Sequence, residues 1–510
     1  MYKKVLSCAV WGIDGRIIGV EVDISDGLPT FSMVGYLSSS VKESAERVRT
    51  ALKNSNFYLP PKRITINLTP ADIRKDGSGF DLPIACALLM CLGIELENGL
   101  SNTIIIGELG LNGSIRPVTG ILPMLSHSFE QGYDTCIVPF DNVNEAMLVK
   151  GLKVIGLKSL ESLKAYLLGD EPDFYGVGGS IYADEAAKGY DVDFSDIKGQ
   201  LSLKRGMEIA AAGFHNVLMT GAAGAGKSMI ARRLPTIMPK LSFEEQMEVT
   251  KIYSVCGLLT TQDKLIHERP FRSPHHTSSG YALVGGGHIP KPGEVSLAHN
   301  GVLFLDELPE FSKNALEVLR QPLEDRQISI SRVNASYIFP SDFMLVAAMN
   351  PCPCGNYPNM SKCSCSPMAI KRYQNKISGP LMDRIDIHMA VEPLNYEEIF
   401  EADTGECSDI IRQRVEGARE RQLFRYKQEA ISFNSQLSSK LIQKYIRLDS
   451  ECEALLKSTF TTQELSARGT FRILKLARTI ADLEGHEDIS LSNLAEAIFF
   501  RNHKLTEENI

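Results

Sequence analysis

The chain lacks a long hydrophobic run, an export signal and an excess of basic residues. Its longest apolar stretch, residues 82–94, is shorter than the roughly 20 residues that cross a bilayer, and it contains a proline. The N-terminus reaches Gly12 and Asp14 before any long apolar region and is therefore a poor signal peptide. These features predict a protein without a membrane partner. The net charge of −8 argues against a generally basic nucleic-acid coat but leaves room for a local basic channel.

The eleven cysteines are odd in number, and seven of them are scattered singly along the chain. Without an export signal, this distribution predicts a reduced cytoplasmic location rather than a disulfide framework. The other four form two CxC pairs separated by eight residues: Cys352, Cys354, Cys363 and Cys365. Four thiolates from two turns can close a tetrahedral Zn²⁺ site that leaves no position for water, so the predicted zinc is structural. An Fe–S cluster and metal-free thiols remain the alternatives.

The length of 510 residues predicts several domains, because a chain of this length is too long to fold around one hydrophobic core. Strand-like and helix-like runs alternate over residues 1–168. Residues 169–192 are rich in Gly, Asp and Tyr without apolar periodicity, which predicts a linker. Strands and helices alternate again over 193–390, with long Gly/Pro insertions, and 391–510 is nearly all helical in pattern. The expected fold is therefore an α/β multidomain chain that ends in a helical domain.

The most specific motif is the stretch HNVLMTGAAGAGKSMIARRL at residues 215–234. An apolar strand runs into GxxxxGKS, which opens a helix, and this context disfavours a chance glycine turn. Backbone N–H groups of such a loop cradle phosphate oxygens, a lysine reaches the β- and γ-phosphates, and a serine ligates Mg²⁺. The predicted ATP-binding residues are Gly221, Ala222, Ala223, Gly224, Ala225, Gly226, Lys227 and Ser228.

A second segment, GVLFLDELPEF at 301–311, supplies two carboxylates at the end of an apolar strand. Asp306 is predicted to hold Mg²⁺ together with Ser228, and Glu307 to polarise the attacking water. Alone, this pattern also fits an ordinary surface strand end, but downstream of a phosphate-binding loop it predicts an ATPase. Asn350, which ends the apolar run 343–350, is a candidate for contacting the γ-phosphate or the lytic water; its alternative is a turn former.

Two arginines and one basic helix are further candidates. Arg384 lies beside two aspartates in GPLMDRIDIHM, and Arg468 opens a predicted helix. Each could stabilise phosphate charge or form an ordinary ion pair. Residues 410–427 place six Lys/Arg and two Glu at helical spacing, which fits either a solvated face or a phosphate-binding face.

Two insertions are predicted to form hairpins, at 271–299 and around a Val-Asn turn at 327–339. Their polar residues Lys291, His288 and Arg332 are candidates for phosphate contact, and packing between subunits is the alternative. The adjacent His275 and His276 are poorly placed to bind one metal ion together.

In the order and amino-acid sequence of these segments, the chain resembles the YifB/ComM family of magnesium-chelatase-like AAA+ ATPases over essentially its whole length. The matching stretches are DFSDIKGQ (193–200), GAAGAGKS, GVLFLDE, RPFRSPHHTSSGYALVGGG (269–287), AAMNPCPCG and SGPLMDRID. Relatives often have GPPGSGKT, but alanine for proline and serine for threonine keep the phosphate cradle and the Mg²⁺ ligand. The resemblance implies an AAA+ core with a helical lid. By it, Asn350 is sensor 1, Arg384 the arginine finger that acts on the next subunit, and Arg468 sensor 2.

The N-terminal part resembles the Lon-type peptidase fold, which uses a nucleophilic serine and a general-base lysine. In KDGSGFDLPIA (75–85) the nucleophile position falls on Gly79, with Ser78 one residue off, and the lysine position falls on Leu122. A Ser–Lys mechanism needs both groups. The domain is therefore expected to be non-proteolytic, as is the same region of RadA-like DNA-repair ATPases.

The family resemblance implies a homo-oligomer, expected to be a hexameric ring, that acts on single-stranded or branched DNA. The implied activity is helicase action or branch migration on recombination intermediates during DNA uptake or repair. An alternative is the ATPase subunit of a magnesium chelatase, which normally lacks the peptidase-like domain and the CxC pairs, and both are present here. A protease or unfoldase is the third possibility, and the missing dyad weakens it.

Overall fold

The computed structural model describes residues 1–94, 100–179, 189–260, 265–287, 290–332, 335–393 and 405–501. The chain forms two compact units. Unit 1 consists of Met1–Ala186, Phe243–Ile266 and Ser331–Ile338. Unit 2 consists of Ala187–Ser242, His267–Ile330 and Phe339–Ile510. Two segments that lie within the ATPase part of the sequence therefore belong to the compact unit of the N-terminal residues.

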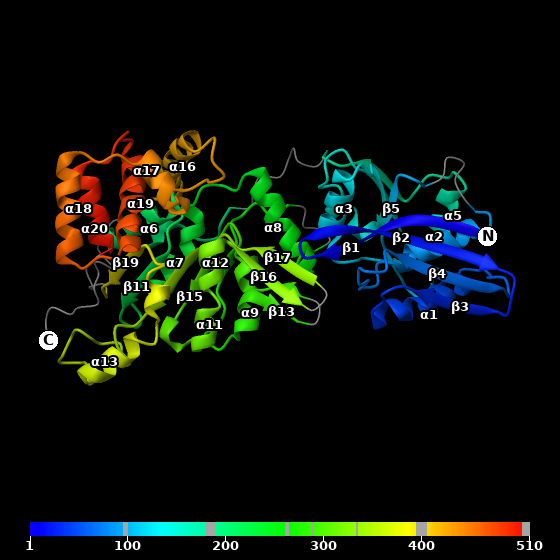
Figure 1. Cartoon of the computed structure of the whole chain (residues 1–510), viewed down its shortest axis with the longest axis horizontal. Helices are drawn as coiled ribbons and strands as arrows, with labels where there is room; N and C mark the ends of the chain where they lie inside the picture. The colour runs from blue at the N-terminus through cyan, green and yellow to red at the C-terminus, as the bar shows by residue number, and fades with distance from the viewer. Residues whose placement is uncertain are drawn as a thin grey trace. The chain divides into compact units, whose positions relative to one another are not determined.

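Unit 1 is built on an eight-stranded mixed sheet of order β10-β9-β8-β5-β1-β2-β4-β3 (Figure 1). Its strands are β1 (Tyr2–Trp11), β2 (Asp14–Ser25), β3 (Thr30–Val34), β4 (Arg63–Thr69), β5 (Thr103–Ile105), β8 (Thr135–Pro139), β9 (Lys153–Leu157) and β10 (Phe174–Val177). The short strands β6 (Glu108–Leu109) and β7 (Ile115–Arg116) pair separately. Strand β3 lies at one edge and pairs in parallel with β4. Apolar residues on alternate positions of β2, among them Val20 and Val22, are fully buried, as the period of a strand requires.

The helices of unit 1 enclose two hydrophobic cores. They are α1 (Ser39–Asn54), α2 (Asp81–Cys91), α3 (Ile121–Glu130), α4 (Val143–Ala146), α5 (Leu160–Leu167) and α8 (Phe243–Cys256). All eleven residues of α2 are buried, so this apolar stretch is a core helix. Helix α8 packs against α3, and the Gly120 amide donates to the Ser254 carbonyl at 3.1 Å.

Unit 2 contains a five-stranded sheet of order β12-β15-β18-β11-β19 in which every pairing is parallel. The strands are β11 (Val217–Gly221), β12 (Phe271–Arg272), β15 (Val302–Leu305), β18 (Met344–Met349) and β19 (Ile387–Val391). Strands β15 and β18 are buried at every position, as strands covered on both faces are. The first strand of the sheet, β11, lies between β18 and β19. At such a change in strand order, ligands bind beyond the carboxyl ends of the strands.

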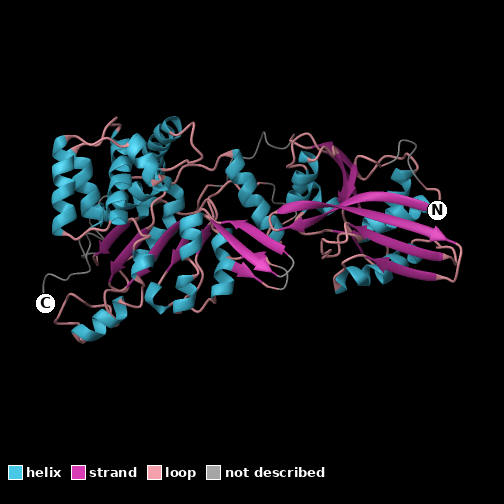
Figure 2. Cartoon of the chain, in the orientation of Figure 1, coloured by secondary structure: helices cyan, strands magenta, loops and turns pink. Residues whose placement is uncertain are grey.

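Helices surround this sheet and then continue into a C-terminal region in which Figure 2 shows helices and loops alone among the described residues. The helices near the sheet are α6 (Leu201–Gly213), α7 (Lys227–Ile237), α9 (Gly280–Val284), α10 (Glu294–Leu297), α11 (Lys313–Glu317), α12 (Arg320–Asp325), α13 (Pro367–Gln374) and α14 (Gly379–Met382). The C-terminal helices are α16 (Ser408–Arg425), α17 (Ser439–Tyr445), α18 (Ser450–Thr462), α19 (Ala467–Glu484) and α20 (Leu491–Arg501). One hydrophobic core includes Val217 and Val346 of the sheet together with Leu476 and Ile480 of α19. The C-terminal helices are thus packed into the ATPase core.

The segment expected to be a linker contains regular structure. Within 169–192, expected to be a linker, residues 174–177 form β10 and pair with β9, while 180–188 lie outside the described residues. Strand β10 is an edge strand of four residues, too short for a clear periodic pattern.

The two insertions differ in how far they form hairpins. β16 (Gln327–Arg332) and β17 (Ala335–Pro340) pair as expected, with their turn outside the described residues. Among the described residues of 271–299, the strands that pair with each other are β13 (Gly285–Gly286) and β14 (Lys291–Pro292), of two residues each. Here α9 forms because the Ser279 hydroxyl caps it, accepting from the Ala282 amide at 3.2 Å. His288 lies outside the described residues. Among the described helices, none has both the length and the apolar character needed to cross a bilayer.

Candidate nucleotide-binding site

The phosphate-binding loop joins the end of β11 to the start of α7, and its glycines are required by the backbone. A Cβ atom at Gly221 would lie 2.2 Å from the carbonyl oxygen of Val391 on the neighbouring strand. Gly224 and Gly226 have φ angles of +79° and +88°, which side chains disfavour. The loop therefore curls so that its amides and the start of α7 form an anion-binding turn.

Lys227 connects the ends of two parallel strands. Its ammonium donates to the carbonyl oxygens of Gly221 at 2.6 Å and Ala222 at 2.8 Å, and to Asn350 Oδ1 at 3.2 Å. The residue is buried, and burial lowers the pKa of its amine, while Asp306 and Glu307 act in the opposite direction. The structure thus brings the predicted phosphate lysine and the predicted sensor asparagine together.

Ser228 and Asp306 form the second pair of the site. The Ser228 hydroxyl donates to Asp306 Oδ2 at 2.6 Å, and the other carboxylate oxygen accepts from the Glu307 amide at 2.9 Å. A hydroxyl and a carboxylate side by side are the hard oxygen ligands that Mg²⁺ prefers. The two residues therefore fit the predicted Mg²⁺ site and would hold the ion there.

Glu307 follows in a conformation that a non-glycine residue rarely adopts, with φ of +51°. Such backbone strain costs on the order of 1–3 kcal/mol and concentrates at functional sites. Its carboxylate is half exposed and lies 3.0 Å from His276 Nδ1. Residue spacing gave no signal for this pair. The parallel pairing of β12 with β15 brings the segment after Phe271 to the segment after Val302.

The two predicted arginines meet at one carboxylate in a separate pocket of unit 2. Arg384 forms an ion pair with Glu324, and Arg468 Nη2 lies 3.8 Å from the other Glu324 oxygen. Arg384 also donates to the Pro380 carbonyl at 2.6 Å. The pocket has a volume of about 150 Å³ and is also lined by the cations Arg472 and Lys475. In the described part of the chain, the ion pairs and hydrogen bonds of these two arginine side chains go to Glu324 and Pro380 and not to Lys227, Ser228 or Asp306.

The four predicted metal ligands lie in one cluster. Cys352 Sγ is 3.4 Å from Cys354 Sγ and 3.7 Å from Cys363 Sγ, and Cys354 Sγ is 3.6 Å from Cys363 Sγ. The Sγ atom of Cys365 is the fourth, and all four sulfurs lie within 4.8 Å of one another. A Zn–S bond of about 2.3 Å places tetrahedral sulfurs about 3.8 Å apart, so this arrangement fits a bound Zn²⁺.

The cysteine cluster borders the phosphate-binding loop. A Cβ atom added to Gly355, the residue after Cys354, would lie 3.8 Å from the Ala223 amide nitrogen and 4.0 Å from Asn350 Cγ. The cluster also begins two residues after Asn350. The folding of the cluster therefore bears directly on the position of Asn350.

Comparison with known proteins covers nearly the whole chain. Three family models match in succession. Residues 20–142 match the model described as subunit ChlI of Mg-chelatase, and residues 193–399 match the one described as magnesium chelatase, subunit ChlI. Residues 405–501 match the model described as magnesium chelatase, subunit ChlI C-terminal. The protein YifB of Escherichia coli K12 is 42% identical over 97% of this chain and 96% of its own length. Competence protein ComM of Haemophilus influenzae is 41% identical over 98% and 97%. The chain belongs to the YifB/ComM family of magnesium-chelatase-like AAA+ ATPases.

A shorter similarity, 25% identity over 184 residues, relates the chain to Lon protease 2 of Bacillus subtilis. The predicted α/β multidomain fold, with its parallel-sheet ATPase core and helical C-terminal region, is confirmed. Membership of the AAA+ family implies ATP and Mg²⁺ as ligands.

In this family member, the positions of the peptidase dyad carry no paired hydroxyl and amine. Leu122 is fully buried, and its amide donates to Glu145 Oε1 at 2.9 Å. The Ser78 hydroxyl is hydrogen-bonded to Glu108. Burial raises the pKa of the Glu145 carboxyl, which also accepts from Ser254 of α8. Helix α8 therefore packs against the segment of this chain that matches the lysine segment of a peptidase.

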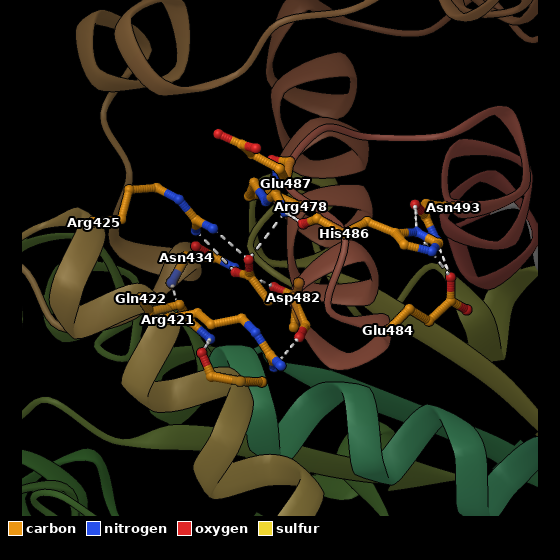
Figure 3. A network of polar contacts seen from close by, with 12 residues as sticks. Arg421, Gln422, Arg425, Asn434, Arg478, Asp482, Glu484, His486, Glu487 and Asn493 are labelled. Carbon is orange, nitrogen blue, oxygen red and sulfur yellow. Dashed lines mark hydrogen bonds and ion pairs between the residues drawn. The ribbon is translucent and has the colours of Figure 1, made fainter.

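The basic helix 410–427 forms α16 in this structure, and its arginines are engaged within the protein. Arg425 pairs with the buried Asp482, which Arg478 contacts at 3.1 Å and Asn434 at 2.8 Å (Figure 3). Arg421 donates to the Asp482 carbonyl at 2.8 Å. One face of the helix thus packs against α19, α6 and α7, while Arg414 and Arg421 on it are exposed, as the prediction of a solvated face expects.

Proposed function

We propose that the chain is an ATP-hydrolysing ring motor that acts on DNA, by helicase action or branch migration on recombination intermediates. The observation that carries the ATPase step is the meeting of Lys227, Ser228, Asp306 and Asn350 at the carboxyl ends of adjacent parallel strands. The similarity to a protein named for competence, over nearly the full length of both, supports a DNA substrate in DNA uptake or repair.

Within one protomer, each side chain has a separate role. Lys227 binds the β- and γ-phosphates, and Ser228 with Asp306 holds Mg²⁺, which when bound neutralises charge on those oxygens. Glu307 orients the attacking water and accepts its proton. Asn350, fixed by Lys227, contacts the γ-phosphate or that water. His276 holds the Glu307 carboxylate in place.

Arg384 acts on the nucleotide of the next protomer in a ring, which we propose to be a hexamer, and Arg468 acts as sensor 2. Their joint position at Glu324, in a pocket that Asp383, Arg472 and Lys475 also line, supports contact with phosphate because a triphosphate needs several positive partners. Each hydrolysis site is then complete only at an interface between protomers. We assign residues 193–390, apart from the segments 243–266 and 331–338 that belong to unit 1, to the ATPase core, residues 391–510 to the helical lid, and residues 1–168 to a non-proteolytic domain.

The four-cysteine cluster holds a structural Zn²⁺ that fixes the loop between Asn350 and the segment of Arg384. We expect the purified protein to contain one zinc per protomer by elemental analysis. The Cys354→Ser variant should lose the metal and turn over ATP about tenfold more slowly, because the sensor asparagine is displaced, while still binding nucleotide. Cys407→Ser, which changes a cysteine outside the cluster, is the control. Purified protein with neither zinc nor iron, or a Cys354→Ser variant with full turnover, would exclude this role.

ATP turnover measured with single-stranded, duplex and branched DNA tests the proposed function. We expect DNA to stimulate turnover severalfold, and a labelled four-way junction to be migrated only when ATP is present. A chain that neither binds DNA at low salt with ATP present nor changes its turnover would instead favour the metal-insertion or protein-remodelling alternative.

A further inference from the structure

The edge of the unit 1 sheet carries a groove of about 330 Å³ that the ATPase mechanism does not use. It lies between edge strand β3, the C-terminal end of α1 and the segment that leads into β4. The lining residues on which the argument depends are Phe31, Arg49, Lys53, Phe57, Tyr58 and Lys62.

The charge of the groove is positive although the chain as a whole carries −8. Arg49, Lys53 and Lys62 line it, and its described lining includes no carboxylate. Arg49 and Lys53 are exposed on α1 and form no ion pair with a carboxylate in the described part of the chain. Lys62 pairs at 2.8 Å with Asp26, which is 91% exposed and outside the groove lining. The groove therefore concentrates cations in a way that suits a polyanion.

Aromatic rings accompany these cations. Tyr58 is 72% exposed, so one face of its ring is open to a ligand beside the cations. Phe31 is half-buried on β3, and Phe57 is buried beneath the groove. An exposed ring beside cations is the arrangement on which unpaired bases stack while phosphates are neutralised.

We propose that this groove binds single-stranded nucleic acid, with Tyr58 stacking on a base and Arg49 and Lys53 contacting phosphates. A duplex would present its phosphates but hide its base faces, so the exposed ring favours an unpaired strand over a duplex. An acidic peptide would satisfy the cations but would make no use of a stacking surface. The inference deepens the proposed function, because it places a strand-binding site of that motor in unit 1, outside the ATPase core.

The test measures how tightly the parent chain and its variants bind a labelled oligothymidylate of about 12 nucleotides. Binding is measured on the full chain without ATP, by fluorescence anisotropy at several salt concentrations. The variant Arg49→Ala/Lys53→Ala should bind more weakly, with a slope of log K against log salt shallower by about 1.4, since each single-strand phosphate contact contributes about 0.7. Tyr58→Ala should bind about tenfold more weakly at an unchanged slope. The control Tyr175→Ala/Lys42→Ala/Lys150→Ala removes one exposed tyrosine and two cations elsewhere in unit 1 and should bind as the parent does.

Three results would overturn the proposal: equal binding by the groove variants and the control, a shallower slope with no effect of Tyr58→Ala, or competition by polyglutamate but not by an abasic strand. None of these outcomes depends on ATP hydrolysis. A motor that fails to respond to DNA while the groove variants lose oligothymidylate binding would contradict the proposed function and leave the groove intact as a site.

Discussion

Replacing Glu307 by glutamine is expected to reduce ATP turnover by about 10²–10⁴-fold while nucleotide binding is retained. The amide keeps the shape of the carboxylate but cannot accept a proton from the attacking water. Lys227 and the Ser228–Asp306 pair, which we propose to bind the phosphates and Mg²⁺, remain in place. Steady-state turnover and binding of a fluorescent ATP analogue measure the two effects separately.

Two comparisons make this result specific. Glu310→Gln makes the same chemical change three residues away, at a surface carboxylate that pairs with Lys376 at 3.1 Å, and should turn over at the parental rate. Lys227→Ala should instead lose nucleotide binding itself. A Glu307→Gln variant that hydrolyses ATP as fast as the parent would assign the role of proton acceptor to another group.

The parts of the site that could be predicted from sequence are those whose chemistry is continuous along the chain. The phosphate-binding loop is one segment, and its glycines, Lys227 and Ser228 follow one another in the order that the ligand requires. Asp306 and Asn350 end buried strands, and parallel strands bring their carboxyl ends to one edge. The pairing of Lys227 with Asn350 and of Ser228 with Asp306 follows from that sheet order.

Contacts between segments that are distant along the chain could not be predicted, because they leave no pattern in the sequence. The approach of His276 to Glu307 depends on the pairing of β12 with β15, and neither residue type signals the other. The sequence of the basic helix 410–427 showed its charges but not the partners of its arginines. The buried Asp482, which pairs with Arg425, lies more than fifty residues further along the chain. Likewise, nothing in the spacing of the segment 243–256 indicates that it packs against α3.

Replacing Arg384 by alanine is expected to reduce turnover by about 10³-fold, with little change in nucleotide affinity. In the proposed role the guanidinium acts on charge that develops in the transition state of the neighbouring site, so its loss should affect hydrolysis rather than binding. Arg372→Ala, at an exposed arginine of α13, is the matched control and should retain parental turnover. Loss of affinity equal to the loss of turnover would indicate a ground-state role.

Mixing two inactive variants separates action across an interface from action within one protomer. Arg384→Ala protomers keep an intact phosphate-binding loop, and Lys227→Ala protomers keep an intact arginine. In a one-to-one mixture about a quarter of the interfaces of a ring combine the two intact halves. If Arg384 acts on the neighbour, the mixture should regain a measurable fraction of parental turnover, because each such interface is complete. If it acts within its own protomer, the mixture stays inactive, and the pocket around Glu324 then holds a structural arginine cluster and not the donor side of an interface.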